Sequence, residues 1–76
     1  MQKLLEILRD LNADVEWEKE GAIIDDGLID SFDIIALVGE LDEQFGVTIE
    51  LEHLEPENFN SLEAIAKLLQ SLGAQI

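Results

Sequence analysis

Ser31 is the residue whose type and setting most strongly suggest chemistry, because its hydroxyl group lies just before an apolar helical stripe. A catalytic serine needs a neighbouring base, and the one histidine of the sequence, His53, lies in a different predicted connection. The residues around Ser31 also lack the G-x-S-x-G turn of many hydrolases. We therefore interpret Ser31 as an attachment point and expect no catalytic residues in the chain.

A second interpretation of Ser31 is helix capping. An Asp-Ser pair in front of an apolar run can accept hydrogen bonds from free N–H groups of the first helical turn. Ser61 also precedes a predicted helix, and we assign it a capping role alone. The dipeptide Asp30-Ser31 therefore does not decide between capping and attachment, and the surrounding pattern must do so.

A calcium loop is the metal site that the sequence superficially suggests, around Glu16, Glu18 and Glu20. Counting from Glu16, the twelfth position is Gly27, where an EF-hand has a bidentate glutamate. The early ligands would also be Glu rather than Asp or Asn. We expect no metal site in this chain.

Composition limits the possible partners. The 76 residues suffice for one small core, and we expect a single domain over residues 1–76. Hydrophobic residues make up 47% of the chain, which favours folding despite a net charge of −14. Such a charge repels a phosphate backbone, so we exclude nucleic acid and expect basic protein surfaces as partners. No segment has the roughly 20 apolar residues of a membrane span, and we expect a cytoplasmic monomer without membrane insertion.

Helical periodicity appears first between Lys3 and Leu11, where leucines recur at helical spacing. Residues 12–29 have no sustained period, and we expect a long loop held to the core by two apolar islands, Val15 with Trp17 and Ala22-Ile23-Ile24. A second helix is predicted from Asp30 or Ser31 to Phe45, with Gly46 as its stop. Its inward stripe comprises Ile34, Leu37, Val38, Leu41 and Phe45.

The remaining residues predict one short and one longer helix. Val47 and Ile49 indicate an extended connection, and Pro56 suits the first position of a short helical turn ending at Phe59. Asn60 or Ser61 is expected to cap the final helix, with Glu63 completing a capping box on Asn60, and Gly73 ends it. The sequence thus predicts an all-α bundle of three to four helices with a long first loop.

The residues around Ser31 resemble the phosphopantetheine attachment segment of acyl carrier proteins: Gly27-Leu28-Ile29-Asp30-Ser31-Phe32-Asp33-Ile34-Ile35. The resemblance extends from about Leu4 to Leu72 and includes the helix order and the Pro56-Glu57-Asn58-Phe59 segment. It implies a carrier whose serine holds a covalent 4′-phosphopantetheine arm, installed from coenzyme A by a phosphopantetheinyl transferase. It also implies acyl cargo held as a thioester for enzymes of fatty-acid, polyketide or related specialised biosynthesis.

The outward face of the second helix is the main partner-recognition surface that the resemblance implies. Its acidic groups are expected to speed encounter with basic acyl-loading and acyl-processing enzymes, while two apolar residues anchor the contact. The expected docking residues are Asp30, Phe32, Asp33, Ile35, Ala36, Gly39, Asp42 and Glu43.

The resemblance leaves the pathway open. Ala36 and Gly39 stand where housekeeping fatty-acid carriers usually present a carboxylate and a larger apolar side chain, which favours a specialised stand-alone carrier. A phenylalanine at position 32, in place of the commoner leucine, is similar to both the stand-alone carriers of specialised pathways and the D-alanyl carrier proteins. A D-alanyl, aminoacyl or peptidyl carrier is one alternative, and an unmodified acidic helical adaptor is another. An acyl chain slipping between the helices would meet Leu37, Leu41, Leu62, Ile65 and Leu69.

Overall fold

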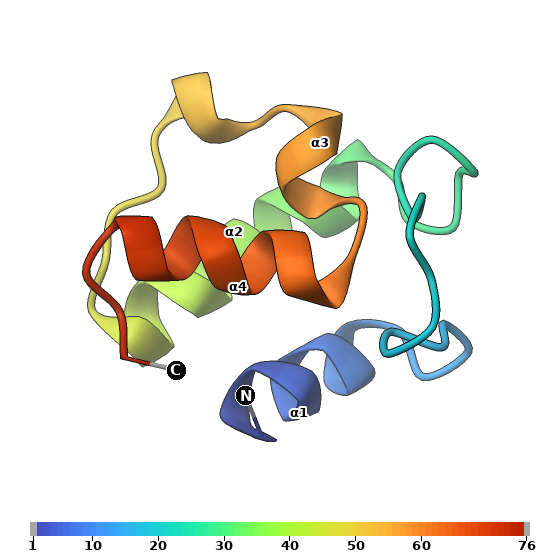
Figure 1. Cartoon of the computed structure of the whole chain (residues 1–76), viewed down its shortest axis with the longest axis horizontal. Helices are drawn as coiled ribbons and strands as arrows, with labels where there is room; N and C mark the ends of the chain where they lie inside the picture. The colour runs from blue at the N-terminus through green and yellow to red at the C-terminus, as the bar shows by residue number, and fades with distance from the viewer. Residues whose placement is uncertain (1, 76) are drawn as a thin grey trace.

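The fold is an all-helical bundle, as the sequence predicted. A computed structural model describes residues 2–75, with Ser31 described by its backbone alone. In chain order (Figure 1) the elements are α1 (Gln2–Leu11), α2 (Ser31–Phe45), the 3-10 helix η1 (Leu51–His53), α3 (Pro56–Phe59) and α4 (Leu62–Ser71). The short helix η1 was not predicted. No helix within residues 2–75 combines the length and apolar character needed to cross a lipid bilayer.

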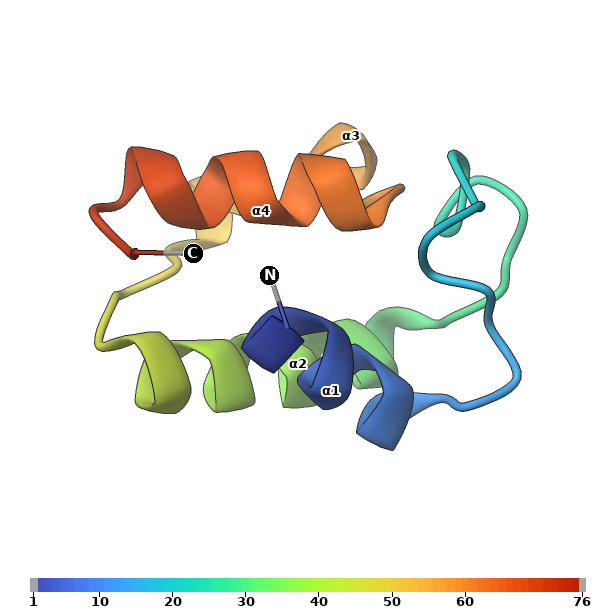
Figure 2. The same ribbon diagram turned by 60° about the horizontal axis from the view of Figure 1, so that its bottom comes forward.

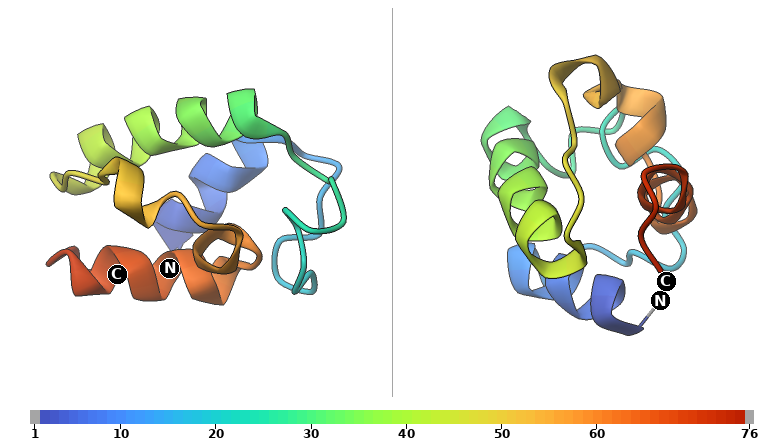
Figure 3. Two further views of the ribbon diagram at one scale, coloured as in Figure 1. Left: turned by 90° about the horizontal axis from the view of Figure 1, so that it is seen from above. Right: turned by 90° about the vertical axis from the view of Figure 1, so that its left-hand side faces the viewer.

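The helices form two layers around one core. Figure 2 shows α1 and α2 on one side and α3 and α4 on the other, with the long loop closing one end of the bundle. Seen from above (Figure 3, left), α2 and α4 run along opposite edges and α1 lies diagonally between them. The buried side chains of residues 2–75 are all apolar, and those with almost no exposure include Leu4, Leu8, Leu37, Leu41, Ile65 and Leu69.

The long loop is held to this core at the two predicted apolar islands. Val15, Trp17 and Ile23 are all buried. The indole N–H of Trp17 donates to the carbonyl oxygen of Asn12 at 3.0 Å, so the ring is buried with its polar atom satisfied. Trp17 is therefore a core residue of the loop.

The ends of α2 and α4 follow the predicted glycine stops. Gly46 (φ 65°) and Gly73 (φ 97°) both have the left-handed backbone that a residue without a Cβ adopts readily. At the end of α2, the Lys3 ammonium donates to the carbonyl oxygen of Gln44 at 2.7 Å and lies 5.2 Å from the centre of the Phe45 ring. A cation from α1 thus stabilises the negative end of the α2 dipole.

The predicted capping box between Asn60 and Glu63 is wrong. Ser61 is the N-cap of α4, and its hydroxyl oxygen accepts from the N–H of Ala64 at 3.0 Å. Glu63 lies 3.5 Å from the ammonium of Lys67 instead. Asn60 is engaged elsewhere, because its side-chain oxygen accepts from the N–H groups of Ile24 and Asp25 in the long loop.

Candidate functional site

The start of α2 is held in place by the loop residues before it. Gly27 has a positive φ of 72°, and the N–H of Leu28 donates to the carbonyl oxygen of Ile23 at 2.9 Å, which closes a turn. Ile29 is buried in the core. The residues directly before Asp30 are therefore held against the core, which gives the first turn of α2 a defined position.

A capping box at Asp30 and Asp33 begins the helix. Asp30 is the N-cap, and its carboxylate accepts from the N–H of Asp33 at 3.0 Å. The Asp33 carboxylate accepts in return from the N–H of Asp30 at 3.2 Å. The capping function therefore belongs to Asp30, and Ser31 follows it as the first residue of the helix.

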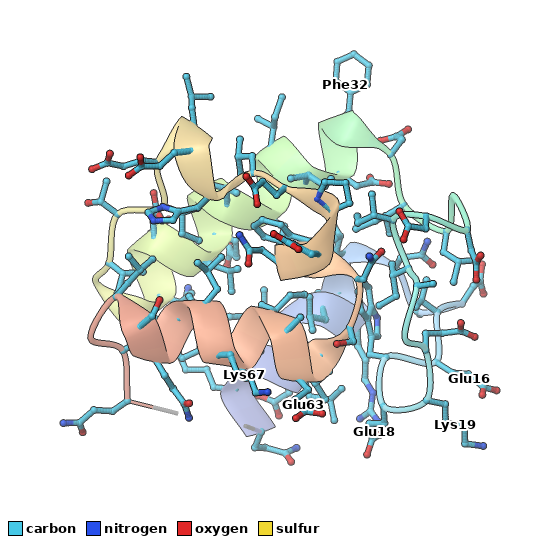
Figure 4. The ribbon with its side chains drawn as sticks, turned by 45° about the horizontal axis from the view of Figure 1, so that its top comes forward. Glu16, Glu18, Lys19, Phe32, Glu63 and Lys67 are labelled. Carbon is cyan, nitrogen blue, oxygen red and sulfur yellow. The ribbon has the colours of Figure 1, made fainter. Side chains whose placement is uncertain are left out.

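The first turn of α2 lies at the surface. Asp30 is exposed, and the Phe32 side chain is 81% exposed, projecting away from the bundle in Figure 4. The position of the Ser31 hydroxyl lies outside the described part of the structure. Both sequence neighbours of Ser31 are therefore at the surface of the molecule.

The local electrostatics suit an anionic ester at this position. The N–H groups at the start of a helix have no intrahelical acceptor, and Asp30 satisfies that of Asp33. These N–H groups and the helix dipole favour a negative group by typically 0.3–1 kcal/mol at an exposed site. The charges of Asp30 and Asp33 oppose that attraction.

The predicted docking residues divide into two groups. Ile35 is 65% exposed, and Ala36, Gly39 and Glu43 are exposed on the same outward face as Phe32. Asp33 and Asp42 are half-buried, and both carboxylates accept hydrogen bonds from the backbone. The Asp42 carboxylate accepts from the N–H of Ile49 at 3.0 Å, so this residue fastens the chain that follows α2.

Two residues of interest were missed by the sequence analysis. Leu51 on η1 is 86% exposed, more than any other large apolar side chain described. The sequence did contain a signal for this residue, because Leu51 is an apolar residue that belongs to none of the predicted helical stripes. Asn60 was assigned to capping, and its role in holding the loop was not anticipated because its partners lie 35 and 36 residues away in sequence.

The inward residues considered for cargo are mostly closely packed. Leu37, Leu41, Ile65 and Leu69 have at most 1% exposure, and Leu62 is half-buried. A hollow of about 190 Å³ lies instead at the seam of α1 and α2, lined by Ile7, Leu11, Ala36, Leu37 and Glu40. An acyl chain among the inward leucines therefore requires the helices to move apart.

The structure also places the residues that were considered for catalysis and for calcium binding. His53 is half-buried, and its Nδ1 accepts from the N–H of Glu50 at 3.1 Å. The residues 16–20 form turns in which Glu16 lies 3.7 Å from the ammonium of Lys19. Within residues 2–75, no cluster of three or more histidine or carboxylate side chains is placed to hold a metal ion.

The chain matches a known protein family. The family model described as a phosphopantetheine attachment site matches residues 2–69, which include all of α1, α2 and α3 and most of α4. The start of α2 lies well inside the matched range. No curated protein matches the chain at a significant level of similarity.

Proposed function

The chain belongs to the phosphopantetheine attachment family, and from this premise we propose that Ser31 is the residue that takes the arm. Proteins of this family are carriers without catalytic activity of their own, and 4′-phosphopantetheine is attached to them covalently. The observation that supports Ser31 is its position as the first residue of α2, directly after the capping residue Asp30 and beside exposed Phe32.

The residues of the chain have positioning roles in this proposal. The arm supplies a thiol that holds cargo as a thioester. Asp30 and Asp33 hold the first turn through their mutual capping bonds, so an attached group leaves the protein from a rigid helix end. Because the two carboxylates repel an anionic phosphodiester, we expect the arm to be held loosely at the surface.

The cargo and pathway form the finer part of the proposal. We propose acyl intermediates of fatty-acid, polyketide or related specialised biosynthesis, delivered between partner enzymes in the cytoplasm. The outward face of α2, with Gly39 and Ala36 beside exposed Phe32 and Ile35, supports a dedicated partner. A D-alanyl or aminoacyl carrier would use the same attachment site, and mass spectrometry of the native loaded form distinguishes these cargoes.

Intact mass after modification tests the attachment residue. The chain is incubated with coenzyme A and a broad-specificity phosphopantetheinyl transferase, and we expect the mass of one phosphopantetheine group to be added. Ser31→Ala should gain nothing, whereas Ser61→Ala, which changes the serine at the start of α4, should be modified like the wild type. An unmodified wild-type chain would favour the acidic adaptor, and a modified Ser31→Ala variant would place the arm elsewhere.

Salt tests the electrostatic part of the partner surface. No Lys or Arg occurs from Glu20 to Ala66, and the cation shown beside α2, Lys3, lies at its far end from Ser31, at Gln44 and Phe45. Screening at higher ionic strength should therefore lower the modification rate at limiting carrier concentration. A rate that is indifferent to salt contradicts electrostatic attraction by this face.

A further inference from the structure

Leu51 presents an apolar side chain on an element that adds no buried residue to the core. η1 spans Leu51–His53, and none of its three residues is buried. Leu51 itself is 86% exposed, slightly more than Phe32 at the start of α2. A single exposed leucine is common on protein surfaces. The way in which this one is held, and its surroundings, distinguish it.

Hydrogen bonds give η1 a defined shape. The N–H groups of His53 and Leu54 donate to the carbonyl oxygens of Glu50 and Leu51 at 2.9 and 3.1 Å. The Glu50 N–H donates to Nδ1 of His53. The side-chain amide of Asn58 donates to the carbonyl oxygen of His53 at 2.9 Å, which ties η1 to α3. Leu51 is therefore carried by an ordered turn, and binding a partner there loses little conformational entropy.

The charged residues next to Leu51 in sequence are all acidic. Glu50 and Glu52 flank it and are exposed, and Glu55 and Glu57 follow at the start of α3. A hydrogen bond between the Glu55 and Glu57 side chains and their mutual repulsion raise the pKa of Glu55. The nearest basic residues in sequence are Lys19 and Lys67. This combination of an apolar residue with uncompensated carboxylates is complementary to an apolar hollow edged by Lys or Arg.

η1 lies on the same side of the molecule as the first turn of α2. Figure 4 shows both elements at the top of the view, where Phe32 projects, while Glu16, Lys19, Glu63 and Lys67 lie at the opposite side. A protein that approaches the attachment position can therefore contact both elements at once. A second copy of this chain is disfavoured as the occupant, because its own charge is −14.

We propose that Leu51 is a second docking contact for the phosphopantetheinyl transferase, meeting an apolar and basic part of its surface while Phe32 and Ile35 contact another part. This inference rests on the proposed function, since it presupposes that a transferase modifies Ser31. It adds η1, an element outside α2, to the surface that determines partner choice.

Kinetics of Leu51→Gln test the proposal. A secondary contact at an interface contributes less than a central anchor residue, so we expect KM for the carrier to rise by about five- to tenfold with kcat unchanged. Melting curves of the variant should match the wild type, because the side chain is exposed. A KM within twofold of the wild-type value overturns the proposal, and an unmodified wild-type chain instead overturns the proposed function.

A binding measurement and a matched charge control complete the experiment. Ser31→Ala, which cannot be modified, should bind the transferase more tightly than the double variant with Leu51→Gln. Glu52→Gln and Glu16→Gln remove the same charge from opposite sides of the molecule, and Glu52→Gln should weaken binding more at low salt. If the two glutamate variants weaken binding equally, Lys or Arg residues of the transferase do not face Glu52. A change in self-association on Leu51→Gln, with unchanged transferase binding, would assign the leucine to contacts between copies of the chain.

Discussion

The starts of α2 and α4 use the same residue types for different purposes. At α4, the Ser61 hydroxyl caps the helix by accepting from Ala64, and the residue is half-buried. At α2, the Asp30 carboxylate caps the helix, and Ser31 stands one position further along. A serine before an apolar stripe is thus a structural cap when it occupies the N-cap position. When an aspartate takes that position, the serine after it is not needed for capping.

The two helix starts are also physically connected. Asn60, directly before Ser61, accepts hydrogen bonds from Ile24 and Asp25 and donates to the Asp25 carboxylate at 3.1 Å. Its carbonyl oxygen accepts from the Ile23 N–H at 2.8 Å. The loop that leads into Ser31 is therefore fastened to the residue before the N-cap of α4.

The largest loss of stability is expected when the hydrogen bonds between Asn60 and the long loop are removed. Asn60→Ala leaves the part-buried N–H of Ile24 without its acceptor, which should lower the free energy of unfolding by about 1–3 kcal/mol. Asn58→Ala, which removes one hydrogen bond to His53, is the matched control and should cost roughly 1 kcal/mol or less. Urea unfolding of both variants measures the difference. Equal losses would mean that Asn60 does not fasten the loop.

Removal of the two caps should have a smaller effect, and removal of Ser31 hardly any. Asp30→Ala and Ser61→Ala should each lower the free energy of unfolding by about 1 kcal/mol. Ser31→Ala should change it by no more than about 0.5 kcal/mol, as expected away from caps and core. The same unfolding measurement checks all three variants. A loss of 1 kcal/mol in Ser31→Ala would give that serine a structural role like that of Ser61.

Salt should stabilise the region of α2 more than that of α4. Within α2 the charged residues are all acidic, namely Asp33, Glu40, Asp42 and Glu43, whereas in α4 Glu63 is close to Lys67. Screening of the repulsion should raise the melting temperature by roughly 2–4 °C, equivalent to about half a kcal/mol. Amide exchange should slow more in α2 than in α4. A salt-independent melting temperature contradicts the repulsion.

The smallest effect concerns Glu55 beside the start of α3. Its pKa is raised in the folded chain because the protonated Glu55 carboxyl donates a hydrogen bond to the Glu57 carboxylate, and because the charge of Glu57 repels a second charge beside it. A carboxyl with a raised folded-state pKa binds its proton more readily when folded, so stability is gained in mild acid and lost as pH rises through the raised pKa. Mild acid should therefore raise the melting temperature slightly, and Glu57→Gln should make that rise smaller. An identical pH profile in the variant would show that the pair has no effect on stability.

The parts of the molecule that were predictable are those that depend on near neighbours in sequence. The stripe of α2, its end at Gly46 and the position of Pro56 at the start of α3 follow from residues three or four positions apart, or from one residue's backbone preference. The Asp30-Ser31 pair was located for the same reason. η1 escaped prediction because three residues held by local turns produce no apolar period.

The sequence by itself determined where the α-helices lie, that the chain is acidic, and which serine follows an aspartate at a helix start. Only the tertiary structure decided that Asn60 fastens the long loop, that Asp42 accepts from the N–H of Ile49, and that Leu51 is exposed on η1. The reason is physical. Helix formation depends on local spacing, whereas the partner of a polar side chain depends on which backbone groups the packed core brings beside it.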